Sequence, residues 1–165
     1  MPSIEKLSCR HAGNMSDWAV SQITANLTNL RSLKLEGAYI ISVNSARSLV
    51  KCAGLTALDV SFSEMRLEGA TRLANGLGST LVSLDISNSD VGDDGARVLA
   101  SKLSNVRDLN IGGNDVSVAG AEAIAPLLHR LEALGVGDNK MGDKVRAAAA
   151  CVEPELENIV RSDDG

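Results

Sequence analysis

The chain has 165 residues and a formal net charge of -5, so it is long enough for one domain and too acidic for general binding to nucleic-acid phosphates. Apolar residues make up 44% of the sequence, but it holds only one Trp, one Tyr and one Phe, which predicts a core of aliphatic side chains. No apolar run could span a bilayer, and the first residues lack the apolar segment of a signal peptide. The three cysteines are widely spaced without a CxxC pair, so we expect reduced thiols and a cytoplasmic protein.

One apolar spacing recurs along the chain. Each copy has apolar residues at its first, fourth and sixth positions, and the copies begin at Ile4, Leu30, Leu55, Leu81, Val106 and Leu131. A seventh copy begins at Leu156 but has Arg161 at its third apolar position, where the pattern ends. A constant period predicts stacked repeats, so we expect a single domain over residues 1–165, with residues 152–165 as a polar C-terminal cap.

Each repeat combines two kinds of periodicity. The alternating apolar residues of the first half predict a short strand, and the second half has apolar residues three and four positions apart, as in Gly95, Ala96, Leu99 and Leu103. The same Gly-Ala pair occurs at Gly69 and Gly120, where it would let a helix start close to its neighbour. Because one repeat cannot bury both its strand and its helix, stacked repeats would share one core.

The repeats resemble those of leucine-rich repeat proteins. The consensus LxxLxLxxN is complete in VRDLNIGGN at residues 106–114 and in LEALGVGDN at residues 131–139, while Ser89, Ser63, Ala38 and Ala12 replace the Asn in earlier repeats. The phrases GATRLA, GARVLA and GAEAIA are similar to ribonuclease-inhibitor-like and GALA-like repeats; Cys52 is a single match to the cysteine-containing class. The resemblance implies a right-handed α/β solenoid of about six repeats, with parallel strands on its concave face and helices on its convex face. It also implies a protein-binding scaffold.

The acidic stretch DISNSDVGDDGARVLA at residues 85–100 is the strongest candidate for chemistry, but it matches no ligand-binding motif. It lacks the Gly and the final Glu of a calcium loop, and no Lys follows its last glycine as a phosphate loop requires. We therefore predict that Asp93 and Asp94 cap a helix. No metal-ligand set, catalytic triad or cofactor motif converges, so we expect no enzyme, cofactor or metal.

The residues expected on the concave face contain an acidic stripe. Asp59 and Asp85 take equivalent positions in adjacent repeats, and the like charges would lie one strand apart, at a cost in stability that a basic partner would relieve. The alternative is an ordinary solvated surface, since this face has few of the aromatic and Arg anchors typical of interfaces. The predicted partner-binding residues are Lys34, Glu36, Asp59, Ser61, Asp85, Ser87, Asp108 and Asn110. The glycines at positions 112, 135 and 137 would let a partner backbone approach.

The function expected from the sequence is a non-enzymatic scaffold that binds a protein, with no nucleic acid and no membrane. Two alternatives stay open: a substrate-recruiting arm of a ubiquitin ligase or bacterial effector, and an assembly subunit that forms homo-oligomers through an uncapped N-terminal end at Ile4. Tyr39 and Phe62 follow their strands and would either flank a partner, or only plug the turn or lie on the surface. Trp18 is expected in the core or in a cap.

Overall fold

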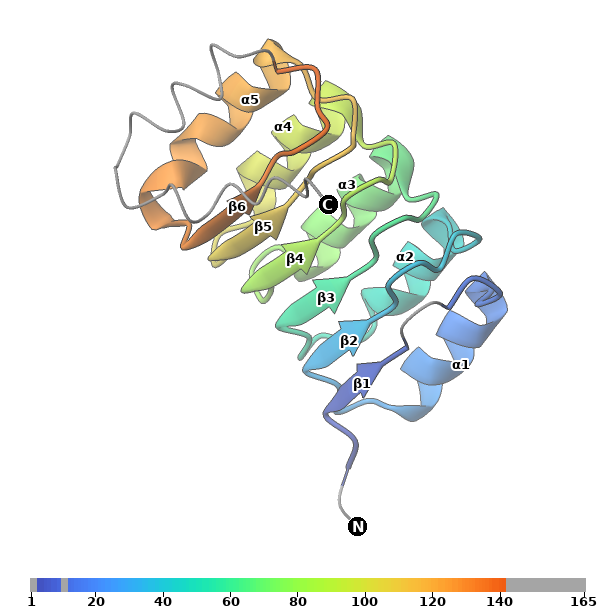
Figure 1. Ribbon diagram of the computed structural model, residues 1–165. Coiled ribbons are helices and arrows are strands. Elements are labelled where there is room, and N and C mark those ends of the chain that lie inside the picture. The colour runs from blue at the N-terminus through green and yellow to red at the C-terminus, as the bar shows by residue number, and fades with distance from the viewer. Residues whose placement is uncertain (1–2, 10–11, 142–165) are drawn as a thin grey trace.

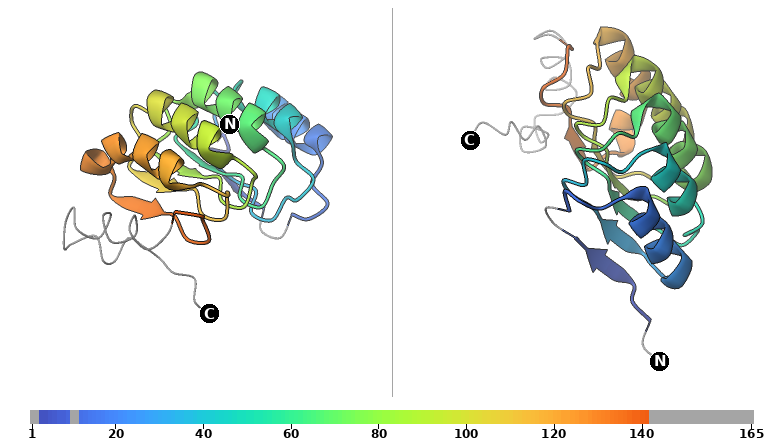
Figure 2. Two further views of the ribbon diagram at one scale, coloured as in Figure 1. Left: turned by 90° about the horizontal axis from the view of Figure 1, so that it is seen from above. Right: turned by 90° about the vertical axis from the view of Figure 1, so that its right-hand side faces the viewer.

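The computed structural model describes residues 3–9 and 12–141, and strands and helices alternate through this part of the chain. The strands form one sheet, and the helices lie along one face of it (Figure 1). Two further views show the strands lining the inside of the curve and the helices the outside (Figure 2). The elements are β1 (Lys6–Ser8), α1 (Asp17–Asn26), β2 (Ser32–Lys34), α2 (Val43–Leu49), β3 (Ala57–Asp59), α3 (Arg66–Leu77), β4 (Ser83–Asp85), α4 (Gly92–Lys102), β5 (Asp108–Asn110), α5 (Val118–Ile124), the 3-10 helix η1 (Ala125–Arg130) and β6 (Ala133–Gly135).

The sheet runs in sequence order from β1 to β6, and every neighbouring pair is parallel. The register repeats at each step, because the central leucine of one strand faces the central leucine of the next, as Leu58 faces Leu84 and Leu84 faces Leu109. This regularity follows from the constant repeat length. The predicted α/β solenoid with about six repeats is therefore confirmed.

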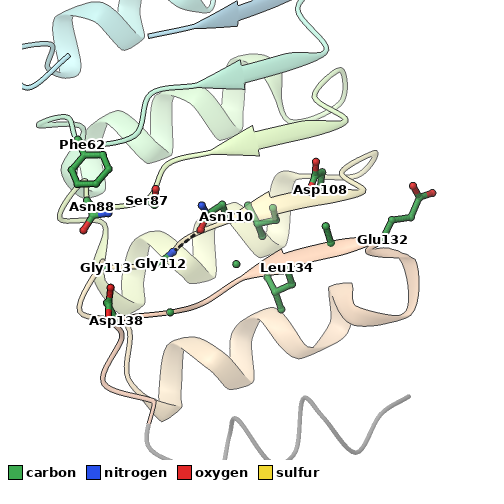
Figure 3. A pocket seen from close by; sticks show the side chains of 14 residues that line it. Phe62, Ser87, Asn88, Asp108, Asn110, Gly112, Gly113, Glu132, Leu134 and Asp138 are labelled. Carbon is green, nitrogen blue, oxygen red and sulfur yellow. Dashed lines mark hydrogen bonds between the residues drawn. The ribbon is translucent and has the colours of Figure 1, made fainter. Parts of the chain in front are cut away.

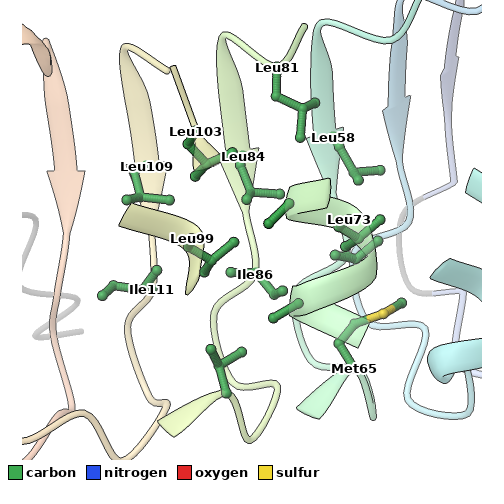
Figure 4. Close-up of a cluster of buried hydrophobic side chains, with 14 of the residues drawn as sticks. Leu58, Met65, Leu73, Leu81, Leu84, Ile86, Leu99, Leu103, Leu109 and Ile111 are labelled. Carbon is green, nitrogen blue, oxygen red and sulfur yellow. The ribbon is translucent and has the colours of Figure 1, made fainter. Parts of the chain in front are cut away.

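The core lies between the sheet and the helices. In the second to sixth repeats all three apolar positions are buried in it, and Leu30, Leu33 and Leu35 have no exposed surface, whereas Ile4 of the first repeat is exposed. The helices add their own stripe, with Leu73 and Leu99 packed between successive strands (Figure 4). A fully buried leucine contributes about 2 kcal/mol of transfer free energy, and its neighbours in adjacent repeats supply the burial.

A ladder of polar side chains satisfies the turns behind the sheet. Asn114 donates to the carbonyls of Ile86, Ile111 and Gly112, and its Oδ1 accepts from the amides of Ser89 and Val91. Asn139 makes the equivalent bonds one repeat later. Where the sequence has serine, the Ser63 and Ser89 hydroxyls lie 3.2 Å apart and both reach the carbonyl of Val60. In the second repeat, the amide of Ala38 instead donates to the carbonyl of Leu35.

The turns after β2 to β6 share one position at which the residue has positive φ. This residue stands seven positions after the first leucine of its repeat, and it is Gly37, Phe62, Asn88, Gly113 and Asp138 in successive repeats. Glycine adopts this conformation without strain, and Asn and Asp tolerate it. Phe62, with φ of 56°, is the exception, because a bulky side chain rarely occupies the left-handed region.

Two aspartates join the helices of neighbouring repeats. Asp93 in the first turn of α4 accepts hydrogen bonds from the amides of Ser117 and Gly120, at 2.7 and 3.1 Å, and from the Ser117 hydroxyl at 2.6 Å. Asp17 in α1 accepts from the amides and hydroxyls of Ser42 and Ser45 at the start of α2. We call these two arrangements the inter-repeat caps.

The inter-repeat caps change the role expected for Asp93. Its position in the first turn of α4 is as predicted, but its carboxylate caps the helix of the next repeat rather than its own. Hydrogen bonds from Ser117 lower the pKa of Asp93. Burial alone would raise the pKa of Asp17, but the bonds from Ser42 and Ser45 outweigh it and lower the value. Asp94 contacts Arg97 in an exposed ion pair.

The prediction for Trp18 was wrong. Its side chain lies on α1 and is 71% exposed, while Val20 and Thr24, one helical turn apart, supply the buried face of this helix. Trp18 precedes Val20 by two positions, which places it on a different side of the helix. The predicted C-terminal cap at 152–165 lies outside the described residues.

Candidate protein-interaction surface on the concave sheet

The concave face presents the first and third residue of each strand in two rows. One row contains Lys34, Asp59, Asp85 and Asn110, each directly facing the next across the parallel sheet. The other row contains Asp108, which faces Ser83. The predicted adjacency of Asp59 and Asp85 is confirmed, because β3 and β4 pair them in register.

In the first row, the side chains of Asp59, Asp85 and Asn110 each accept a hydrogen bond from the backbone amide two residues later. Asp59 Oδ1 accepts from the amide and hydroxyl of Ser61, at 3.0 and 2.8 Å. Asp85 Oδ1 accepts from the amide and hydroxyl of Ser87, at 3.0 and 2.7 Å. Asn110 Oδ1 accepts from the amide of Gly112, two residues later in the same repeat, at 3.1 Å. These local bonds fix each side chain on the sheet before any partner arrives.

Ser61 and Ser87 are buried, with 4% and 7% of their surface exposed. They stand two residues after Asp59 and Asp85, and their hydroxyls donate to the carboxylates of these two residues and orient them. Lys34 and Glu36 are exposed at the N-terminal side of the face. The eight residues predicted from the sequence thus divide into exposed or half-buried side chains and two positioning serines.

Asp85 is the most perturbed acid on this face. Burial raises its pKa, and the neighbouring charge of Asp59 adds to that effect, although bonds from Ser87 and Asn110 oppose it. Asn110 Nδ2 donates to the second carboxylate oxygen of Asp85 at 2.9 Å. Within residues 3–9 and 12–141, none of the ion pairs includes Asp59 or Asp85, although Lys34 on β2 faces Asp59 across the sheet.

A groove of about 460 Å³ lies on the concave side of β5 and β6 and of the turns that follow β3 and β4 (Figure 3). Phe62, Asn88 and Asp138 lie at one end, Asp108 and Glu132 lie at the other, and Asn110 lies between them (Figure 3). The full lining is Phe62, Ser87, Asn88, Asp108, Leu109, Asn110, Gly112, Gly113, Glu132, Ala133, Leu134, Gly135, Gly137 and Asp138. The lining contains three acids and neither Lys nor Arg.

Sequence reasoning included Asp108, Asn110 and Ser87 among the partner-binding residues but missed Asn88, Glu132 and Asp138. The missed residues stand at the ends of the strands, in the turns that lead into and out of the sheet. A signal for Asn88 and Asp138 is present in the sequence, because both occupy the position seven residues after the first leucine of a repeat.

The glycines of the last repeats have a more specific role than expected. A Cβ atom at Gly135 would overlap the Asn110 carboxamide oxygen, and one at Gly113 would overlap that of Asn88. These glycines make room for two side chains of the preceding repeats, and the absence of their own side chains leaves the groove open.

The aromatic side chains Tyr39 and Phe62 form an edge-to-face pair, with ring centroids 6.2 Å apart and planes at 79°. Both remain exposed, at 59% and 44%, and Ile40 beside Tyr39 is 53% exposed. Phe62 also lines the groove. The two rings therefore neither enter the core nor plug the turn, and they form an apolar patch at the edge of the groove.

Among the described residues, no three His, Cys, Asp or Glu side chains converge as a metal-ion site would require. No helix in the same part of the chain is long and apolar enough to cross a membrane. Cys52 is buried in the core, and burial raises the pKa of its thiol. Cys52 thus packs as a small apolar side chain.

The comparison with protein families agrees with the geometry. A model of the Leucine Rich repeat family matches residues 79–100 and 102–125, which cover most of the fourth repeat and much of the fifth. The fold is that of a leucine-rich repeat protein. The ribonuclease-inhibitor-like, GALA-like or cysteine-containing subclass stays a prediction, since no comparison distinguishes these subclasses. A comparison with curated protein sequences finds no match.

Solved structures share the leucine-rich repeat fold at low sequence identity. One described as Leiomodin-1 Actin-Binding Site 2 is 13% identical, with a TM-score of 0.57, and the match covers 81% of this chain and 83% of that one. A chain of the yeast Rad7 and Elc1 complex is 16% identical with a TM-score of 0.51. That match covers 88% of this chain and 53% of the other, so this chain spans about half of that neighbour's length. At these identities the likeness concerns the fold.

Proposed function

We propose that this leucine-rich repeat protein is a non-enzymatic scaffold that binds a protein partner through its concave face. The observation that supports this proposal best is the groove over β5 and β6, because it combines a volume of about 460 Å³ with acidic lining residues that have no ion-pair partner among the described residues. Such a charge arrangement costs stability in the free protein and is relieved by a positively charged partner. The partner is accordingly expected to present a basic surface.

The eight residues predicted from the sequence to bind a partner have two different roles in the proposed function. Lys34, Glu36, Asp59, Asp85, Asp108 and Asn110 contact the partner, whereas Ser61 and Ser87 hold the carboxylates beneath it. The neighbours whose descriptions name an actin-binding site and a complex with Elc1 agree with a binding role for this fold. A cytoplasmic location stays a prediction from the sequence.

Site-directed photo-crosslinking tests the proposal. A photoreactive amino acid placed at Ser83, on the concave face, should capture a protein partner, while the same group at Thr71 on the convex helix α3 should not. Binding of the captured protein, once purified, should weaken on Asp108→Lys and persist on Glu122→Lys in α5, which changes charge on the convex side. Equal capture at Ser83 and Thr71, or equal effects of the two charge reversals, would contradict the proposal.

A second candidate function is assembly through the N-terminal edge of the sheet. Ile4 is 52% exposed beside β1, whose one described partner strand is β2. Open edges of this kind pair with other chains. Sedimentation over a wide concentration range should then show a larger species that Ile4→Lys converts to monomer; a monomer throughout would contradict this role. No feature of the described residues favours the recruiting-arm alternative.

A further inference from the structure

Phe62 is an unusual residue for its position in the repeat. Four other repeats place Gly, Asn, Gly or Asp at the positive-φ position of the turn, and each of these residues adopts that conformation more easily than phenylalanine does. The third repeat instead holds a large aromatic residue there with φ of 56° and leaves 44% of it exposed. Neither the backbone conformation nor burial in the core explains this choice.

The surroundings of Phe62 point to a ligand. Its ring packs edge-to-face on Tyr39, which orients both rings, and it forms one end of the groove (Figure 3). Strained residues and exposed aromatics are typical of binding surfaces, where rigid aromatic side chains act as anchors. The other end of the groove holds two acids, Asp108 and Glu132, whereas the Phe62 end holds one, Asp138, so the groove has an aromatic end and a more acidic end.

We propose that the groove binds an extended segment of a partner protein that carries a large apolar side chain for Phe62 and a Lys or Arg for Asp108 and Glu132. This inference rests on the proposed concave binding function and specifies the partner's chemistry. The acidic end and the absence of Lys and Arg from the lining favour a cationic side chain there. Tyr39 and Phe62 favour an aliphatic or aromatic side chain at the other end.

The groove also constrains the spacing of these two side chains. Phe62 takes the position in the third repeat that Gly113 takes in the fifth, so it lies about 16 Å along the strand direction from Asp108 and two strand spacings, about 10 Å, across the sheet. An extended peptide that joins these two ends has its apolar and basic residues about five or six positions apart. This spacing is the property that a selection experiment can read directly.

A random 12-residue peptide library displayed on phage, selected against the immobilised full-length chain, provides the probe. We expect enrichment of sequences with a Lys or Arg four to seven residues from a Leu, Ile, Phe, Tyr or Trp. The enriched peptides, made synthetically, should lose at least tenfold in affinity on Phe62→Asn and on Asp108→Lys with Glu132→Lys. They should bind normally to Leu67→Asn and Glu122→Lys, which change an exposed apolar and an exposed acidic residue of the convex helices.

Phe62→Asn is the decisive variant because Asn88 occupies the same position in the next repeat, so the variant is expected to fold. Peptides that respond to the charge reversals but not to Phe62→Asn would overturn this inference and leave concave binding intact. Peptides that respond to neither set would count against both proposals. Failure to enrich any such sequence would also overturn the extended-segment inference, while photo-crosslinking would still test concave binding separately.

Discussion

Replacing Asp93 with alanine tests whether this carboxylate joins two repeats. The change leaves the amides of Ser117 and Gly120 and the hydroxyl of Ser117 without their acceptor. Loss of an N-cap side chain costs about 0.5–2 kcal/mol, and water replaces part of the bonding at this half-buried position. Because Asp93 serves two backbone donors and one hydroxyl, we expect the free energy of unfolding to fall by about 2 kcal/mol, at the upper end of that range.

The effect should depend on pH with a defined sign. Hydrogen bonds from Ser117 lower the pKa of Asp93 in the folded state. A carboxyl group of this kind stabilises the fold at pH values above its unfolded pKa, and the contribution disappears as the pH falls through the lower folded value. The difference between wild type and Asp93→Ala should therefore be constant near neutral pH and should shrink as the pH falls below the ordinary value of 3.8.

Urea unfolding at neutral and acidic pH measures these quantities, and Asp94→Ala is the matched control. Asp94 is the next residue of the same helix turn, but its side chain is 73% exposed and pairs with Arg97, so we expect a loss below about 0.5 kcal/mol. Because repeats depend on their neighbours, hydrogen exchange should quicken first in α5 and β6. Equal losses for Asp93→Ala and Asp94→Ala, or an Asp93 effect that persists unchanged in acid, would refute the inter-repeat role.

Three further changes test other parts of the structure. Asn114→Ala removes five hydrogen bonds inside the turns and should lower the free energy of unfolding in urea by about 3 kcal/mol, whereas Ser89→Ala should lower it by about 1 kcal/mol. Equal losses would contradict the role of Asn114 in satisfying the turns. Phe62→Asn should raise the free energy of unfolding by about 1 kcal/mol, because it relieves a left-handed backbone strain, and a lower value would contradict that strain. Asp85→Asn should modestly stabilise the protein at pH 7 but not in acid. The pKa of Asp85 is raised in the folded protein, so its ionised form opposes folding at pH values above that pKa. A loss of stability at pH 7 would show that the hydrogen bonds of the carboxylate outweigh the cost of burying it.

The fold and the acidic row could be predicted from the sequence because both depend on one number, the repeat length. A nearly constant period brings equivalent residues to adjacent strands, so the pairing of Asp59 with Asp85 follows without any knowledge of side-chain packing. Asn114 and Asn139 likewise stand at equivalent positions of adjacent repeats, and both donate hydrogen bonds to carbonyls of the turns. Sequence reasoning succeeds here because the contacts join equivalent positions.

The contacts that sequence reasoning missed join positions that are not equivalent. Asp93 accepts hydrogen bonds from Ser117, but the two residues are not equivalent. Asp93 stands two residues before the Gly-Ala pair of its repeat, and Ser117 stands three residues before the pair of the next repeat. That offset depends on how adjacent helices are shifted along their axes, which the period does not specify. The prediction for Trp18 was wrong for a related reason, because the side of α1 that faces the core depends on the rotation of the helix, and the observed rotation buries Val20.

Departures from the repeat pattern divide into two groups by their energetic effect. The inter-repeat caps at Asp17 and Asp93 add hydrogen bonds and so stabilise the stack. Phe62 and Asp85 oppose stability, one through its backbone conformation and the other through burial of charge, and both lie on the concave side or its edge. Residues that weaken a fold persist when another requirement retains them, so a joint gain in stability and loss of partner binding in Phe62→Asn would identify that requirement as recognition.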